Sequence, residues 1–287
     1  MILRNTLLAL VAFLIASCGQ IGEDDPSPIL YEVSTPEGGV EGWLFGTIHA
    51  LPDGTEWRTE TLNTVLVEAD TLIVEIADLE DAEYLAKTFA QLSRSDGLPD
   101  IGNRVEPDYR PALFTMIDKA GFSPSDFATL ETWAVALTLA QVNATGDPDN
   151  GVDRALIQDF HKGSISEFEG AAVQLAIFDQ LPEAEQQDLL EGVLEESKAE
   201  DPTRLRDAWL AGDVDVLEEA TRTGIMADPE LREAILTGRN NAWLDQLLVV
   251  LKQDEKPLVA VGTAHLLGPD GLPKLLESRG YTVKRIQ

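Results

Sequence analysis

The feature that most constrains the fold is a short motif that occurs twice, near the two ends of the chain. The copies span residues 43–54 and 259–271. Each is an apolar run followed by Gly-Thr-x-His-x-Leu and then by Pro-Asp-Gly. A strand that ends in glycine lets the backbone turn sharply or approach a ligand closely, and ligands of α/β sheets bind outside the carboxyl ends of strands. We therefore expect two neighbouring strands that carry His49 and His265 to one edge of a sheet.

A third apolar run, residues 71–77, places a carboxylate among strand-forming residues, because Glu75 stands between Val74 and Ile76. A carboxylate in a buried strand is costly unless it is paired or bound to a metal. Two imidazoles and one carboxylate are a recurrent set of metal ligands. The sequence therefore predicts one site made by His49, Glu75 and His265. The alternatives are two core histidines bonded to carbonyls and an ion-paired glutamate.

The remaining pattern predicts a single α/β domain, with a central mixed β-sheet, flanking helices and a large helical insertion in the middle of the chain. The turn-forming residues 36–39 predict a hairpin, and Ser123-Pro124 is a helix-start signal. His161 is expected at a helix end, where a cation complements the helix dipole. Strands are expected at residues 29–34, 40–45, 71–77, 163–168, 258–262 and 281–286, and helices at 59–69, 84–92, 109–120, 127–142, 152–161, 240–252 and 272–278, with helical pieces from 171 to 237.

The first 28 residues are expected to lie outside the folded domain. Arg4 precedes an unbroken apolar run, residues 7–16, which is too short to cross a bilayer and fits a secretory signal. Small residues lead to Cys18, and this resembles the lipobox of bacterial lipoproteins. We predict a signal peptide (1–17), a lipid-bearing tether (18–28) and a domain (29–287). The alternative is an ordinary signal peptide with an incidental cysteine.

The predicted lipid anchor would attach the protein to the bacterial cell envelope. Gly19 stands where an inner-membrane retention signal has aspartate, which favours the outer membrane, facing the periplasm. Lys and Arg total 21 against 51 Asp and Glu, a formal net charge of −30, which argues against a nucleic-acid partner. Cys18 is the only cysteine, which excludes a disulfide framework and multi-cysteine metal sites. The sequence gives no indication of the oligomeric state.

Several further motifs resemble those of the TraB/PrgY/GumN family, and specifically of its bacterial GumN-like branch. The likeness begins at about residue 29 and continues to the C-terminus. Thr132 stands where the family's helix has proline. The matching elements are the two Gly-x-x-His motifs that begin at Gly46 and Gly262, the Val-Glu pair at 74–75, Glu131-Thr-Trp133, Gly151-Val-Asp153, Phe168-Glu169 with Gln174, Gly238-Arg239-Asn240 and the closing Gly-Tyr-x-Val strand.

The family is related to the Tiki proteins, which are membrane-tethered metalloproteases dependent on manganese or cobalt. It is related more distantly to erythromycin-esterase-like hydrolases and to haem-binding ChaN-like lipoproteins. The resemblance implies a site made by His49, Glu75 and His265, in which all three would be metal ligands. It also implies that Asp153 and Glu169 would orient the histidine ligands.

Arg239 and Asn240 would be accessory catalytic residues by the same resemblance. Arg239 would neutralise an oxyanion or hold a substrate carboxylate. Asn240 has an alternative role as the N-cap of the last long helix.

These observations lead to the hypothesis of a divalent-metal-dependent hydrolase that cleaves peptides or proteins. The metal would be manganese, cobalt or zinc, and Glu75 would be its third ligand or the general base. One alternative is a metal-free, esterase-like hydrolase in which an imidazole activates water and Glu75 assists. Another is a lipoprotein that binds a peptide, a metal or haem without turnover.

Overall fold

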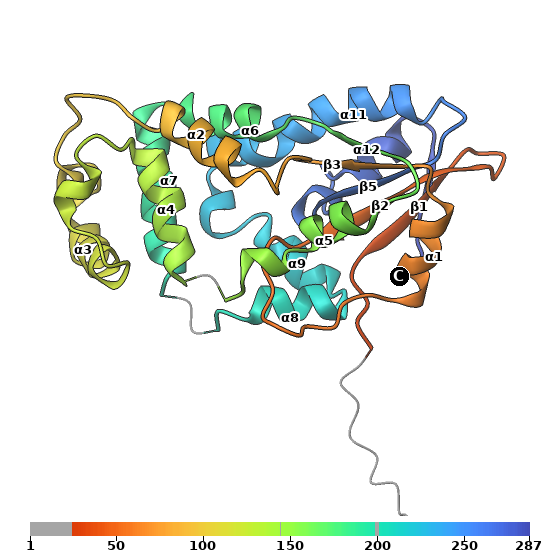
Figure 1. Ribbon diagram of the computed structural model, residues 1–287, viewed down its shortest axis with the longest axis horizontal. Helices are drawn as coiled ribbons and strands as arrows, with labels where there is room; N and C mark the ends of the chain where they lie inside the picture. Colours follow the sequence, from red (N-terminus) through yellow and green to blue (C-terminus); the bar gives the residue numbers. More distant parts are fainter. Residues whose placement is uncertain (1–24, 144, 199–200) are drawn as a thin grey trace, which may run out of the picture.

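The computed structural model describes residues 25–143, 145–198 and 201–287 (Figure 1). The predicted signal peptide, Cys18 and most of the predicted tether lie outside the described residues. Within these ranges, no helix combines the length and the apolarity that a bilayer crossing requires.

In the described residues, six strands form one mixed sheet in the order β4-β3-β5-β2-β1-β6. Strands β4, β3, β5 and β2 are parallel, whereas β1 is antiparallel to both β2 and β6. The α/β class and the mixed sheet predicted from the sequence are confirmed. The strands are β1 (Leu30–Ser34), β2 (Val40–Thr47), β3 (Thr71–Val74), β4 (Ser164–Glu167), β5 (Pro257–Gly262) and β6 (Thr282–Arg285).

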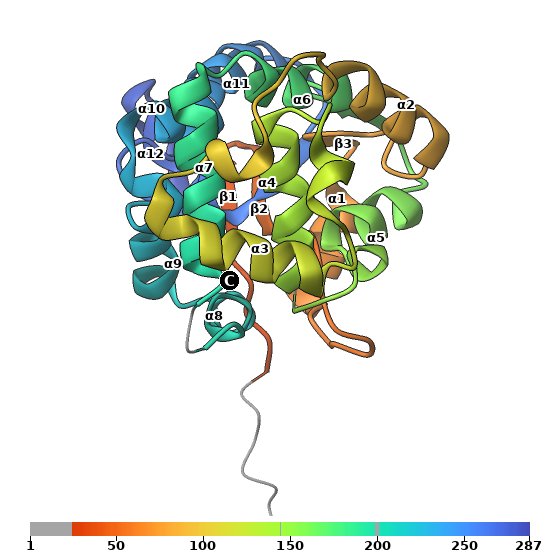
Figure 2. The ribbon, with the colours of Figure 1, turned by 90° about the vertical axis from the view of Figure 1, so that its left-hand side faces the viewer.

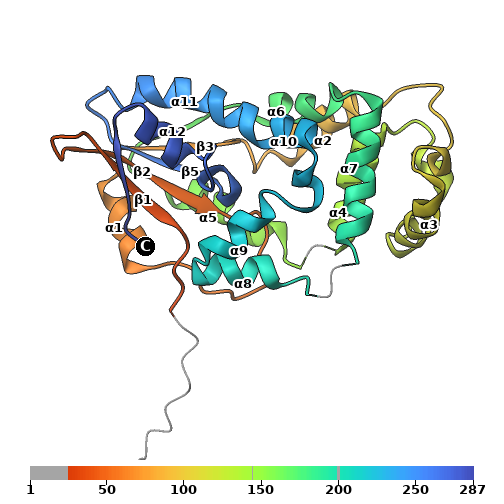
Figure 3. The same ribbon diagram turned by 180° about the vertical axis from the view of Figure 1, so that it is seen from behind.

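Helices cover both faces of this sheet and extend beyond one of its ends. Helices α11 and α12 lie on one face, whereas α1, α5, α8 and α9 lie on the other (Figures 1 and 3). The helices are α1 (Glu60–Glu68), α2 (Ala82–Leu92), α3 (Arg110–Lys119), α4 (Thr132–Ala140), α5 (Val152–Asp159), α6 (Ala171–Asp179), α7 (Glu183–Glu196), α8 (Arg204–Ala211), α9 (Val214–Ala220), α10 (Pro229–Arg232), α11 (Gly238–Val250) and α12 (Leu272–Ser278).

The two faces of the sheet are separate apolar layers because side chains alternate along each strand. Phe45 and Leu72 pack with Trp209 on one face, whereas Leu44 and Val259 pack with Trp243 on the other. The helical middle of the chain has a third core, in which α3, α4 and α7 bury Trp133 among leucines. These helices stand in front of the sheet in the end-on view of Figure 2, as expected for an insertion.

The helix predicted over residues 127–142 begins later than expected. Ser123-Pro124 starts a 3₁₀ turn, Pro124–Phe127, and α4 begins only at Thr132. The buried Arg104 explains the break, because its guanidinium donates to the carbonyls of Leu130 (2.5 Å) and Phe127 (3.0 Å). In a continuous helix the Phe127 carbonyl would accept the Glu131 N–H, which here donates to the Ser93 carbonyl (2.8 Å).

The strands that carry the repeated motif are adjacent. Thr47 at the end of β2 is paired with Gly262 at the end of β5, so the two copies lie side by side in register. Strand β3 pairs with the other edge of β5 and ends at Val74, one residue before Glu75. Glu75 therefore follows its strand and does not lie within it, contrary to the predicted run of 71–77.

Candidate functional site

Three side chains from distant parts of the chain meet around Gly262. A Cβ atom placed on this glycine would lie 3.2 Å from Glu75 Oε1, 3.7 Å from His49 Nε2 and 3.7 Å from His265 Cδ2. Gly46, at the same place in the other copy of the motif, has a packing role. A Cβ there would lie 2.7 Å from Thr263 Oγ1, so only glycine lets the two copies approach this closely.

His49 is held by one carboxylate and is open to solvent on its other side. Its Nδ1 lies 2.8 Å from Asp153 Oδ2, while Thr47 donates a hydrogen bond to Asp153 Oδ1 (2.7 Å). The attraction of Asp153 raises the pKa of His49 to about 9. Because the side chain of His49 is 69% exposed, water screens part of this attraction, but the direction stands. The structure thus makes His49 a more basic imidazole whose Nε2 is free.

His265 has the opposite environment. It is 5% exposed and packs against Trp243, with 4.3 Å between ring centroids. Asn240 donates to the Asp270 carbonyl (2.8 Å), so its Oδ1 faces His265 Nδ1 at 2.6 Å and accepts the proton of that nitrogen. Burial lowers the pKa of His265 to about 3, so the ring is neutral at pH 7.

Asn240 is therefore a positioning residue for His265 and not a helix N-cap. Helix α11 begins at Gly238 and directly continues the π-helix Glu233–Thr237. The expected N-cap role is wrong because the preceding residues already supply the helical hydrogen-bonding pattern.

Glu75 is a buried carboxylate that accepts hydrogen bonds from three donors. Oε1 accepts the Gly262 N–H (2.7 Å), while Oε2 accepts from Arg239 Nη2 (2.5 Å) and Gln174 Nε2 (3.1 Å). Burial by itself raises the pKa of Glu75, but the positive charges of His265 in its protonated form, Arg239 and His49 outweigh burial and lower the pKa to about 2. Since His265 is neutral at pH 7, Arg239 and His49 are the cations that keep Glu75 ionised there.

Arg239 joins the site to a second carboxylate. Its Nε lies 3.1 Å from both oxygens of Glu169, and its Nη1 donates to His265 Nε2 at 3.2 Å. The indole of Trp243 donates to Glu169 Oε1 (2.8 Å) and lies under the guanidinium, 4.6 Å from ring centre to Cζ. Glu169 thus holds Arg239, whereas Asp153 is the carboxylate that orients a histidine.

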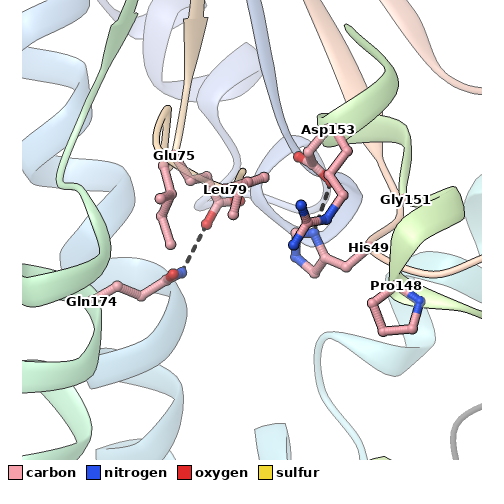
Figure 4. Close-up of a pocket in the computed structure, with 9 residues that line it drawn as sticks. His49, Glu75, Leu79, Pro148, Gly151, Asp153 and Gln174 are labelled. Carbon is pink, nitrogen blue, oxygen red and sulfur yellow. Dashed lines mark hydrogen bonds and ion pairs between the residues drawn. The ribbon is translucent and has the colours of Figure 1, made fainter. Parts of the chain in front are cut away.

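A cavity of about 220 Å³ opens between these groups (Figure 4). Glu75 and Gln174 lie on one side, and His49 and Asp153 lie on the other (Figure 4). His265, Arg239 and Asn240 are buried and do not line it. The lining residues are His49, Glu75, Ile76, Leu79, Pro148, Gly151, Asp153, Arg154 and Gln174.

Some residues of the site had been assigned no role from the sequence. Thr47 belongs to the repeated motif, but only the structure shows its bond to Asp153. Trp243 stands four residues after Arg239 in α11, a spacing that places both on one helix face. Gln174 belongs to one of the family motifs, and only the structure shows that it donates to Glu75 Oε2. His161 follows α5 on the exposed surface and takes no part in the site.

The comparison with protein families agrees with this architecture. A family model described as the TraB/PrgY/gumN family matches residues 29–285. The chain belongs to this family. The match includes both copies of the motif and every site residue from His49 to His265, so the resemblance to the TraB/PrgY/gumN family is confirmed, while the GumN-like branch stays a prediction. Searches of curated proteins and of solved structures each found no match.

The ligand atoms of His49, Glu75 and His265 do not form a ready metal site. In the described part of the chain, a different group has its ligand atoms all within 4.8 Å of one another. It is the partly exposed acidic cluster of Glu185, Asp188 and Asp228. At the candidate site, Arg239 donates to both Glu75 and His265, so a cation already contacts two of the three expected ligands. A metal there would have to displace these bonds.

Proposed function

We propose that this member of the TraB/PrgY/gumN family is a hydrolase that works with His49 and Glu75 in the cavity between them. The observation that carries the proposal is the pairing of a cavity-facing imidazole, supported by Asp153, with a fixed and ionised carboxylate across the cavity. Titratable groups with perturbed pKa values that face a cavity are candidates for acid–base sites.

In the proposed reaction, neutral His49 is the general base. Its Nδ1–H bonds to Asp153, and its Nε2 takes a proton from water as the water oxygen attacks the carbonyl carbon of an ester or amide. The imidazolium then gives this proton to the leaving oxygen or nitrogen as the bond from carbon breaks. The negative charges of Asp153 and Glu75 stabilise the imidazolium.

The buried groups behind Glu75 act through it. Arg239 and the Gly262 N–H hold the carboxylate ionised and in one orientation, while Glu169 holds Arg239. Neutral His265 fills the remaining space and accepts from Arg239. These residues would take no part in proton transfer. They would fix the position and the ionisation of the Glu75 carboxylate, whose negative charge stabilises the imidazolium.

The test is hydrolysis of a panel of p-nitrophenyl esters and fluorogenic peptides by the purified domain. His49→Ala is expected to lower kcat/KM by roughly 10²- to 10⁴-fold, the usual contribution of a general base. His161→Ala is the matched control, because it removes the exposed histidine outside the site. If His49→Ala hydrolyses the panel as fast as the His161→Ala protein, the proposal is wrong.

A divalent metal (manganese, cobalt or zinc) at His49, His265 and Glu75 is a second candidate. The favouring observation is that each imidazole is held at Nδ1 by a side-chain oxygen and turns Nε2 inward, as metal-binding histidines do. When bound, the metal would polarise the substrate carbonyl and lower the pKa of water. Elemental analysis and activity in excess chelator separate the two candidates, since only the metal-dependent reaction stops in chelator.

The proposal includes peptide or protein substrates and attachment to the cell envelope through lipid on Cys18. Ser27, near the end of the predicted tether, donates to the Leu210 carbonyl in α8 (2.7 Å), so a tether of this length would end at or before this residue. Labelling with a fatty-acid analogue in bacteria tests the anchor. Loss of label in Cys18→Ala is expected, and label that persists in this variant would contradict it.

A further inference from the structure

A cation that the proposed reaction does not use lies on the wall of the cavity. Among the described residues that line it, Arg154 is the one Lys or Arg. Arg154 directly follows Asp153 in α5, and its side chain is 23% exposed, so it lies where the cavity meets solvent. The chain carries a formal net charge of −30, and Glu75 and Asp153 add negative charge to the same cavity. Together with protonated His49, Arg154 is thus a place on this wall where a negative ligand group would be attracted, and it is the one that the proposed reaction leaves unused.

The present partner of Arg154 is easily replaced. Its Nη1 donates to Glu80 Oε1 at 2.8 Å, and Gln158 donates to the same oxygen at 3.2 Å. Glu80 has a side chain that is 54% exposed and does not line the cavity. Ion pairs this open to water contribute little, and a guanidinium has five N–H donors in a planar fork. A second carboxylate can therefore bind beside Glu80 or in its place.

The rest of the cavity limits the size and polarity of the ligand. Ile76, Leu79 and Pro148 form an apolar part of the wall. The volume of about 220 Å³ corresponds to about seven water molecules, which is room for one small residue rather than a folded chain. An aliphatic group against this wall would remove apolar surface from water.

We infer that the substrates are small molecules with a free carboxylate beside an aliphatic group, such as an N-acylated amino acid or the C-terminal residue of a short peptide, and that Arg154 binds this carboxylate. The inference rests on the proposed function, because it names the substrate class of the same site. Since Arg154 and His49 line the same cavity, a carboxylate held by Arg154 shares that cavity with the imidazole that Asp153 orients. Arg154 determines specificity and takes no part in proton transfer.

The decisive experiment measures binding without turnover. Calorimetry measures the affinities of 4-methylpentanoate and of its uncharged amide. The proteins compared are His49→Ala alone and His49→Ala combined with Arg154→Gln or with Arg154→Lys. The carboxylate is expected to bind about 10- to 100-fold more tightly than the amide, as a charge-assisted pair allows. Arg154→Gln removes this preference, and Arg154→Lys keeps part of it. Arg58→Gln is the matched control, because Arg58 also pairs with α5, at Asp159 (2.5 Å), but lies outside the cavity.

Turnover is then measured on N-acetyl-glycyl-leucine and its C-terminal amide. The inference is supported if the free acid is cleaved faster than the amide and if Arg154→Gln removes this preference mainly by raising the KM for the free acid. Carboxylate binding that needs Arg154, without hydrolysis of these compounds or of the panel, supports the carboxylate site at Arg154 and contradicts the proposed function and, with it, the substrate class. Equal binding of acid and amide, or a preference that Arg154→Gln leaves intact, overturns the inference and leaves the proposed hydrolase to its own test.

Discussion

Gly262→Ala is the substitution that most directly tests whether the space between His49 and Glu75 is used. The added methyl would lie 3.2 Å from Glu75 Oε1 and 3.7 Å from His49 Nε2. The first distance is shorter than an ordinary contact, so the carboxylate must move by a few tenths of an ångström, against its bonds to Arg239 and Gln174. The second places the methyl beside the nitrogen that would take the proton.

The fold is expected to tolerate this change. Gly262 has φ −47° and ψ 134°, a negative-φ conformation close to polyproline II that alanine can adopt. Replacing such a glycine stabilises a protein by about 0.4–1 kcal/mol through the unfolded chain, and crowding at Glu75 offsets that gain. We expect the free energy of unfolding to change by less than about 1 kcal/mol, a Tm shift of a few degrees.

Activity is expected to respond much more strongly. Misplacement of catalytic groups by about 1 Å can cost about 10²-fold in rate, or about 2.7 kcal/mol of the barrier. The assay is kcat/KM on the best ester of the panel, with urea unfolding on the same samples. Gly39→Ala is the matched control, because its methyl would make only ordinary contacts, 3.5 Å from Thr35 Oγ1. A folded Gly262→Ala protein with kcat/KM within about twofold of Gly39→Ala would refute the reasoning.

Three further predictions follow from the charges and the buried donors. Neutral His49 is the base, so kcat/KM should rise with pH up to its raised pKa of about 9, and Asp153→Asn should move this rise to lower pH in a pH–rate profile. Glu75 has a pKa lowered from 4.5 to about 2, so its stabilisation is present above pH 4.5 and lost as pH falls towards 2; Glu75→Gln should flatten this part of a stability–pH curve. Arg104→Met should lower the free energy of unfolding by about 3–5 kcal/mol, because three carbonyls lose the guanidinium of Arg104, a residue that is 2% exposed, as their donor. The exposed Arg94→Met is its control in urea unfolding.

Much of the fold could be predicted because the relevant signals are local. Short strand-forming stretches with turn residues between them gave the six strands, and helical spacing gave α1, α5 and α12 within one or two residues. The break before α4 could not be predicted, because Arg104 imposes it from a loop more than twenty residues away. Helix periodicity alone carries no information about such a long-range donor.

The sequence by itself determined that two Gly-Thr-x-His segments end two strands and that Glu75 belongs to a third apolar run, but it placed Glu75 inside the strand rather than after its end. Only the tertiary structure decided how these groups pair. It placed β5 between β3 and β2, brought Arg239 against both Glu75 and His265, and set Arg154 on the cavity wall. The reason is physical: strand ends follow from local pattern, whereas the direction and charge state of each side chain depend on burial and on partners far away in the chain.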